Sequence, residues 1–266
     1  DLQSFRDAGL RPIAVFDLDG TVWSGHIIDG FLGALAESDL VLPEQNGVLK
    51  AVLAKVLELR DNSSIRSNSV QENVKLLMEY TESSSASPKE LISKKDSFFA
   101  TAELLKGLTP EAVALVARQA FNRGSAYFGP WKSRIFHDDA CSMEELIRTL
   151  KGNGIEIYFL SAGLEPTVRA AAEYFGIPLE NAIGSHLIVK DGKYTGEVLS
   201  NYAVKASVVR QRLPNPPLVV VGNSARSDFG MMEEALGVVL MINPDQTLKD
   251  REQKEARGLF VELLYP

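Results

Sequence analysis

The sequence contains one cysteine, Cys141, and only three histidines in 266 residues. A single cysteine excludes a disulfide within the chain and a cysteine-based zinc site. His26, His137 and His186 lie far apart in the sequence and lack the spacing of metal ligands. The sequence therefore does not favour a histidine metal cluster. The candidate chemistry has to be sought in other residue types.

Long apolar runs and an excess of positive charge are also missing. No segment approaches the ~20 apolar residues that cross a bilayer, so the sequence predicts no membrane span. The 28 Lys and Arg residues stand against 35 Asp and Glu, and no basic stripe with interleaved aromatics is present. Because nucleic-acid binding rests on clustered cations, we expect no nucleic-acid partner.

No signal peptide is visible, so we expect a cytoplasmic protein; an exported mature form is the alternative because the chain starts at Asp1.

The composition that remains is that of a globular protein, with 45% hydrophobic and 24% charged residues. Single cores seldom grow past ~250 residues, so this length predicts one core plus a smaller unit. Residues 26–123 show helical spacing, as at Ile27, Phe31 and Leu35, and almost no strand signal. We therefore predict a core domain over residues 11–25 and 124–266, with a helical cap domain inserted over 26–123.

Strand and helix signals alternate on both sides of the insertion. Apolar, β-branched runs predict strands at 11–16, 155–160, 218–221 and 238–242, and a hairpin at 187–198 that turns at Asp191-Gly192. Helices are predicted at 109–120, 142–152, 166–175, 202–212 and 229–236, and the charged run 249–257 is interpreted as a solvated helix face. This alternation predicts an α/β fold, with a Rossmann-like, doubly wound and mostly parallel sheet.

Polar residues follow three of the predicted strands, where ligands of doubly wound sheets bind. They are Asp17-Leu18-Asp19-Gly20-Thr21, Ser161-Ala162-Gly163, and Gly222-Asn223-Ser224 followed by Asp228. Asp17 and Asp19 lean to the same side of an extended chain and repel each other unless a cation or proton lies between them. A strand-to-turn cap would explain one of these carboxylates but not both.

The segment Phe16-Asp17-Leu18-Asp19-Gly20-Thr21 resembles motif one of the haloacid dehalogenase superfamily of phosphohydrolases. Ser161, Lys205, and Gly222-Asn223 with Asp228 resemble motifs two, three and four in the same order. The resemblance extends over about residues 11–243, and the insertion resembles the cap of the phosphoserine-phosphatase-like branch. It implies Mg²⁺-dependent hydrolysis of a phosphomonoester.

The resemblance also implies a role for each motif residue. Asp17 would attack phosphorus to form an aspartyl-phosphate, and Asp19 would protonate the leaving alcohol and then activate water. Lys205 would neutralise Asp17 and the transferring phosphoryl group. The donors to the phosphoryl oxygens would be the hydroxyls of Thr21 and Ser161 and the backbone N–H groups of Leu18, Ala162 and Gly163.

The implied Mg²⁺ ligands are Asp17, the backbone carbonyl of Asp19 and the motif-four acid. The family usually has Asp where this chain has Asn223, which offers an oxygen but no charge. Three interpretations stay open. Asn223 ligates while Asp228 supplies the charge, or Asp228 itself becomes the ligand, or metal binding is crippled and the protein is inactive.

Substrate choice is the least constrained prediction. Phosphoserine phosphatases have a Glu nine residues after the nucleophile, where this chain has His26, which argues against phosphoserine. Trp23 and His26 lie in the turn that joins core to cap, and we expect them to contact substrate. The predicted function is hydrolysis of a small phosphorylated metabolite. Its alternatives are phosphotransfer to an alcohol acceptor and a catalytically impaired binding protein.

Overall fold

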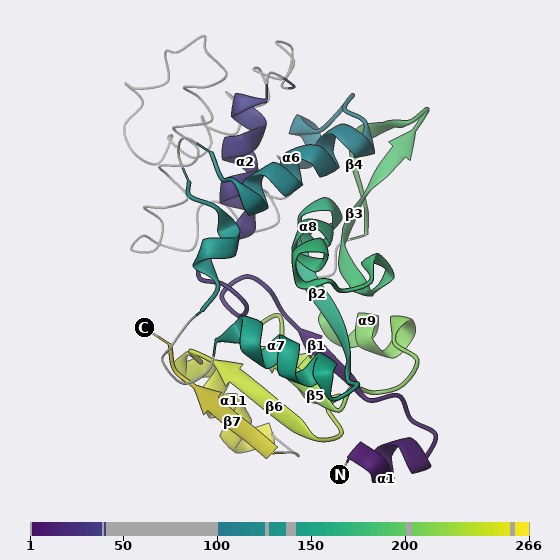
Figure 1. Ribbon diagram of the computed structural model, residues 1–266, viewed down its shortest axis with the longest axis vertical. Coiled ribbons are helices and arrows are strands. Elements are labelled where there is room, and N and C mark those ends of the chain that lie inside the picture. Colours follow the sequence, from purple (N-terminus) through teal and green to yellow (C-terminus); the bar gives the residue numbers. More distant parts are fainter. Residues whose placement is uncertain are drawn as a thin grey trace. The chain divides into compact units, whose positions relative to one another are not determined.

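The computed structural model describes residues 2–38, 40, 101–125, 128–136, 142–200, 204–255 and 259–265 (Figure 1). The chain divides into two compact units. Unit 1 consists of residues 1–26, 132–185 and 201–266, and unit 2 of residues 27–131 and 186–200. The helical spacing predicted within residues 41–100 lies outside the described residues.

The strands follow the hydrogen-bonded order β4-β3-β2-β1-β5-β6-β7. Their bounds are Ile13–Phe16 (β1), Glu156–Leu164 (β2), Ala182–Lys190 (β3), Lys193–Ser200 (β4), Val219–Gly222 (β5), Val238–Ile242 (β6) and Leu259–Leu263 (β7). Neighbouring strands pair in parallel except β3 and β4, which form the predicted antiparallel hairpin. The chain winds outward from β1 in both directions, which confirms the predicted α/β class with a doubly wound, mostly parallel sheet.

Two of the helices, α6 and α7, begin at side-chain caps that the sequence predicts. Their bounds are Leu2–Asp7 (α1), Ile27–Glu37 (α2), Pro110–Asn122 (α6), Met143–Gly152 (α7), Glu165–Phe175 (α8), Lys205–Arg212 (α9), Phe229–Met232 (α10) and Gln246–Glu255 (α11). The Thr109 hydroxyl accepts from the backbone N–H of Ala112, and the Ser142 hydroxyl accepts from that of Glu145. Each hydroxyl satisfies an N–H that has no partner inside its helix, so both predicted helix starts are confirmed.

Two local predictions differ from the structure, and two elements were not predicted. The second strand continues to Leu164, so Ser161 lies within β2 and not beyond it. The helix predicted over 229–236 ends at Met232, because the chain turns back and Leu236 donates its N–H to the Pro217 carbonyl. The short helix α1 and the edge strand β7 were not predicted, since neither is long enough to show a clear period.

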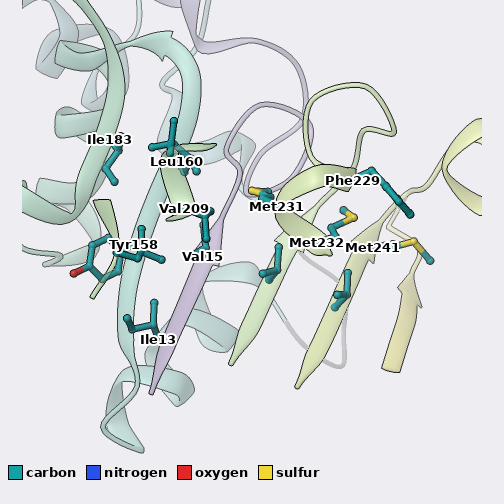
Figure 2. Close-up of a cluster of buried hydrophobic side chains, with 14 of the residues drawn as sticks. Ile13, Val15, Tyr158, Leu160, Ile183, Val209, Phe229, Met231, Met232 and Met241 are labelled. Carbon is teal, nitrogen blue, oxygen red and sulfur yellow. The ribbon is translucent and has the colours of Figure 1, made fainter. Parts of the chain in front are cut away.

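Side chains alternate between the two faces of the sheet in unit 1. Ile13 and Val15 belong to one buried cluster that also contains apolar residues of α9, α10 and α11 (Figure 2). On the other face, Phe159 lies edge-to-face with Phe16 and with Phe175 of α8, with ring centroids 6.4 and 5.5 Å apart. Burial of each large apolar side chain contributes about 1.5–3 kcal/mol. This core fixes the ends of β1, β2 and β5.

Unit 2 combines helices with the β3–β4 hairpin. The helices α2 and α6 pack against each other and bury apolar residues such as Phe31 and Phe121. The Gly107 N–H donates to the Tyr194 carbonyl, and the Tyr194 N–H donates to the Leu108 carbonyl, both at 2.9 Å. These bonds explain why hairpin residues 186–200 group with unit 2, although the sequence places them in the core. No helix in the described ranges has both the length and the apolar character needed to cross a membrane.

Candidate active site

The polar residues predicted to form a site come together at the carboxyl ends of β1, β2 and β5 in unit 1. Phe16, the last residue of β1, is in register with Phe159 of β2 and Val221 of β5. Asp17 therefore follows β1 at the level where β5 ends, and Ser161 lies two residues beyond Phe159 on β2. Parallel strands place such residues at one edge of a sheet, the edge at which doubly wound folds bind ligands.

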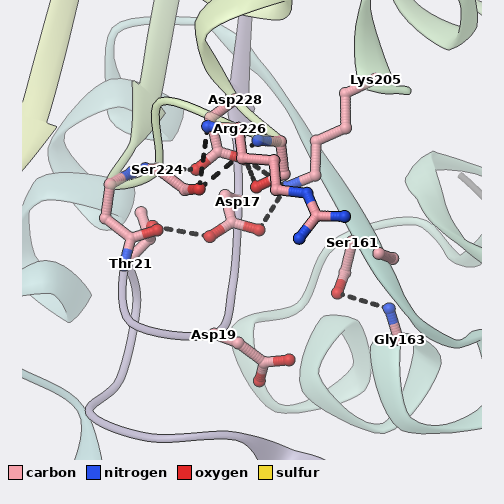
Figure 3. Close-up of polar contacts among 12 residues, drawn as sticks. Asp17, Asp19, Thr21, Ser161, Gly163, Lys205, Ser224, Arg226 and Asp228 are labelled. Carbon is pink, nitrogen blue, oxygen red and sulfur yellow. Dashed lines mark hydrogen bonds and ion pairs between the residues drawn. The ribbon is translucent and has the colours of Figure 1, made fainter. Parts of the chain in front are cut away.

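Asp17 is held by two donors in a buried cluster (Figure 3). The Thr21 hydroxyl donates to Asp17 Oδ2 at 2.7 Å, and Lys205 Nζ donates to Asp17 Oδ1. Lys205 Nζ also donates to Asp228 Oδ1 at 2.8 Å. The side chains of Lys205 and Asp228 are 1% and 0% exposed, so one buried cation is shared by two carboxylates.

Burial and neighbouring charges set the ionisation of this cluster. Burial and the charge of Asp228 raise the pKa of Asp17 and Lys205 opposes them, and the net effect is a rise from 3.8 to about 6. Burial alone would lower the pKa of Lys205, but the charges of Asp17 and Asp228 outweigh it and raise that pKa. Burial would likewise raise the pKa of Asp228, but the Lys205 cation and the hydrogen bonds to the carboxylate lower it. Lys205 therefore stays charged beside Asp228, and Asp17 is the member that titrates nearest neutral pH.

The raised pKa of Asp17 predicts a pH-dependent loss of stability in chelator-containing buffer. Its pKa rises from 3.8 to about 6 on folding, so the folded state binds the proton more tightly. The resulting stabilisation is fully present below about pH 4 and is lost as the pH rises through about 6. The unfolding free energy of wild type should therefore fall between pH 4 and 7 relative to that of the Asp17→Asn variant. Urea denaturation at each pH measures this, and a pH-independent difference contradicts it.

Asp228 uses all of its acceptor capacity inside the protein. Its Oδ1 accepts from Lys205 and from the Ser227 hydroxyl at 2.9 Å. Its Oδ2 accepts from the backbone N–H groups of Asn223 and Ser224 at 3.0 and 2.9 Å. A carboxylate has about four lone-pair positions, so none is left for a metal ion. The geometry favours Asp228 as a residue that positions Lys205 and the loop after β5, and it does not favour the alternative in which Asp228 is a metal ligand.

Two glycines make this close packing possible. A Cβ atom at Gly222 would lie 2.9 Å from the Cβ of Asp228, so a side chain there would displace that carboxylate. Gly20 has a φ of +77°, and a Cβ there would lie 2.2 Å from Nδ2 of Asn223. The Asn223 amide is therefore packed directly against the turn that follows Asp19.

Asp19 is oriented by groups from its own turn. The Trp23 indole is fully buried, and its Nε1 donates to Asp19 Oδ1 at 3.0 Å. Nδ1 of His26 lies 3.8 Å from Asp19 Oδ2, and the His26 side chain is 54% exposed. The turn thus brings Trp23 and His26 to Asp19, where the indole fixes the direction of the carboxylate.

The motif-two residues lie at the end of β2. The buried Ser161 hydroxyl accepts from the Gly163 N–H at 3.0 Å, and the Ala162 carbonyl accepts from the Ser185 hydroxyl at 2.8 Å. The Gly163 N–H, expected to donate to phosphate, is thus bonded within its own segment. In the bond that Figure 3 shows, the Ser161 hydroxyl is the acceptor, so its own proton is available to donate to a ligand.

The described residues fit a magnesium ion by the chemistry of their oxygen donors. No group of three or more His, Cys, Asp or Glu side chains in the described ranges is placed to hold a metal. The available donors are the Asp17 carboxylate, the Asp19 carbonyl and the amide oxygen of Asn223, whose amide nitrogen packs against Gly20. Carboxylate, carbonyl and amide oxygens are the ligand types that Mg²⁺ binds. Of these three donors, only Asp17 contributes a negatively charged carboxylate.

Sequence reasoning missed Arg226, which lies in the loop between Asn223 and Asp228. Figure 3 shows its guanidinium extending over Asp17 on the side of Ser161. Arg226 is the one basic residue in the six-residue segment 223–228, and that placement inside motif four was the available signal. The signal is weak, because exposed loop arginines are common.

A model of the haloacid dehalogenase-like hydrolase family matches residues 14–233. The match covers most of the chain, and the chain belongs to this family.

Among curated proteins, the chain is 29% identical over 121 residues to the chloroplastic phosphoserine phosphatase of Arabidopsis thaliana. That match spans 42% of this chain and 40% of the relative, so less than half of either protein is compared.

Two solved structures share the fold. One, from Anaerococcus prevotii, is 18% identical with a TM-score of 0.61 and covers 94% of this chain and 85% of its own. The other, from Bordetella pertussis, is 16% identical with a TM-score of 0.58 and covers 94% and 98%. Both are described as proteins of unknown function.

Proposed function

We propose that this protein is a Mg²⁺-dependent phosphatase that hydrolyses small phosphomonoesters through an aspartyl-phosphate on Asp17. The observation that carries the proposal is the difference between two neighbouring carboxylates. Asp17 is buried and bonded to Thr21 and Lys205, whereas Asp19 is held separately by the Trp23 indole. Carboxylates in contrasting environments suit different roles in one reaction.

In the first half-reaction, an Asp17 carboxylate oxygen attacks phosphorus and the bond from phosphorus to the leaving oxygen breaks. Asp19 gives its proton to that oxygen, so the leaving group departs as an alcohol. Lys205 and Thr21 hold the attacking carboxylate in a fixed orientation. The Ser161 hydroxyl donates to a phosphoryl oxygen.

In the second half-reaction, Asp19 takes a proton from water, and the water oxygen bonds to phosphorus as the bond to Asp17 breaks. Orthophosphate leaves, and Asp17 is again a free carboxylate. The Trp23 N–H keeps Asp19 aimed at the same place in both half-reactions, as acid and then as base. When bound by Asp17, the Asp19 carbonyl and Asn223, Mg²⁺ supplies positive charge that lets an anionic nucleophile approach an anionic phosphoryl group.

The relative from Arabidopsis thaliana supports a phosphomonoester as substrate, since it is a phosphoserine phosphatase. The exposed His26 beside Asp19 argues for a leaving group other than serine. The test is release of orthophosphate from a panel of phosphoamino acids, sugar phosphates, nucleoside monophosphates and an aryl phosphate. Hydrolysis of at least one by wild type is expected. Phosphate found only on an added alcohol would make the protein a phosphotransferase, and no reaction with any compound contradicts catalysis.

Replacing Asn223 with aspartate is expected to tighten Mg²⁺ binding. The substitution adds a charge to a donor set that has one ligating carboxylate, and it keeps the side chain's shape against Gly20. We expect the Mg²⁺ concentration for half-maximal activity to fall by about 10-fold, since charged ligands raise divalent-ion affinity. Magnesium titrations of both proteins measure the change.

Asn215→Asp is the matched control for that titration. Asn215 bonds Arg11 at the far end of the sheet, so the same added charge lies away from the site. Equal magnesium dependence in wild type, Asn223→Asp and Asn215→Asp would show that residue 223 is not a ligand.

A further inference from the structure

The loop after β5 is held on both sides by hydrogen bonds to its backbone. Inside the loop, the Ser224 hydroxyl accepts from the backbone N–H groups of Arg226 and Ser227 at 3.3 and 3.4 Å. From outside, Nη1 of Arg251 donates to the Ala225 carbonyl at 3.0 Å. The Arg251 guanidinium in turn lies 4.0 Å from the centre of the Phe229 ring. Residue 226 is therefore presented by a rigid backbone.

The Arg226 side chain does not help to hold this loop in place. Its guanidinium makes no hydrogen bond or ion pair with any other residue that the structure describes. It is exposed, and it extends over Asp17 on the side of Ser161 (Figure 3). Arg251, in contrast, bonds the loop and lies over the Phe229 ring.

The charge of the site explains what an arginine can do there. Asp17, Asp19 and Asp228 are three carboxylates, and Lys205 is bonded to two of them. The Lys205 cation is therefore balanced inside the protein before any phosphate arrives. A phosphoryl group carries further negative charge into this space. Its oxygens need donors that are not already committed, and a guanidinium is the side chain best shaped to bind them.

We infer that Arg226 is a substrate-binding residue that donates hydrogen bonds to non-bridging oxygens of the phosphoryl group. The inference rests on the proposed function and extends it. The phosphoryl group has to contact Asp17 and lie within reach of Ser161, and the guanidinium extends over the space between these two residues. This placement favours the phosphoryl group over a second anionic group on the leaving alcohol. Arg226 also adds a positive charge to the loop in which Asn223 replaces the negatively charged Asp that is usual in the family.

Replacing Arg226 with alanine is expected to lower kcat/KM for an aryl phosphate by about 10- to 100-fold, the usual effect of removing a charge-assisted hydrogen bond. Inhibition by orthophosphate, which has no leaving group, should weaken by a similar factor. Arg226→Lys should recover part of both losses, because it keeps the charge but not the forked donors. Arg148→Ala is the matched control, since Arg148 is an exposed arginine on α7 of the same unit.

Two results would overturn the inference while leaving the phosphatase intact. One is an Arg226→Ala variant that matches Arg148→Ala in turnover and in orthophosphate inhibition. The other is a loss confined to substrates with a second anionic group, with orthophosphate inhibition unchanged. If wild type hydrolyses nothing, the proposed function fails by itself. Calorimetric titration of orthophosphate into the protein, with Mg²⁺ present, then decides. Weaker binding of orthophosphate to Arg226→Ala than to wild type supports the anion site. Equal binding to both proteins, or no binding to wild type, overturns it.

Discussion

Replacing Asp17 with asparagine is expected to reduce orthophosphate release to background, a loss of about 10⁴-fold or more in kcat, as is usual when a covalent nucleophile is removed. An amide is a poor nucleophile, and no other carboxylate among the described residues occupies the end of β1 with bonds to both Thr21 and Lys205. The variant should remain folded, because Lys205 keeps its bond to Asp228. Wild type quenched in acid during turnover should carry one phosphoryl group on the peptide that contains Asp17.

The matched control for this substitution is Asp245→Asn. Asp245 accepts from the Leu248 N–H at 2.7 Å at the start of α11, and asparagine is an equally good residue in that role. The control should retain wild-type turnover. Residual activity above a few per cent in Asp17→Asn, or phosphoryl groups on a peptide without Asp17, would assign the nucleophile to another residue.

The fold class and the polar residues at the strand ends could be predicted from the sequence because both depend on local patterns. Buried strands such as Val219–Gly222 are short apolar runs, and polar residues follow them in the sequence. The motif at Asp17 marks the carboxyl end of the first strand. Because helices alternate with the strands, the strands are parallel and their carboxyl ends lie at the same edge of the sheet.

The bonding inside the site could not be predicted, because it depends on atoms that meet only after folding. Nothing in the spacing of Asn223 and Asp228 shows that all four lone pairs of Asp228 are used by the protein. The bond from the Trp23 indole to Asp19 likewise needs the turn at Gly20 to be closed. Sequence spacing therefore identifies the residues of the site, and the hydrogen bonds separate those that contact ligand from those that position them.

Lys205→Met is expected to destabilise the protein by about 3–5 kcal/mol at pH 7.5, the usual effect of removing one partner from a buried ion pair. Methionine keeps an unbranched side chain in the buried space, so the loss reports the missing cation and not a large cavity. Asp17 and Asp228 would then face each other as buried carboxylates without a shared donor. Asp17, whose pKa is already raised to about 6, should take up a proton in response. The destabilisation should therefore be smaller at pH 5 than at pH 8.

Lys249→Met provides the comparison on the surface. Lys249 Nζ bonds Glu262 at 2.6 Å with both side chains partly exposed, and such pairs contribute about 0–1 kcal/mol. Urea denaturation of both variants measures the contrast. The double variant Lys205→Met with Asp228→Asn should lose less than the sum of its single variants, because the second change removes one of the unpaired charges. Equal losses in Lys205→Met and Lys249→Met, or strict additivity in the double variant, would mean that Lys205 does not balance the two buried carboxylates.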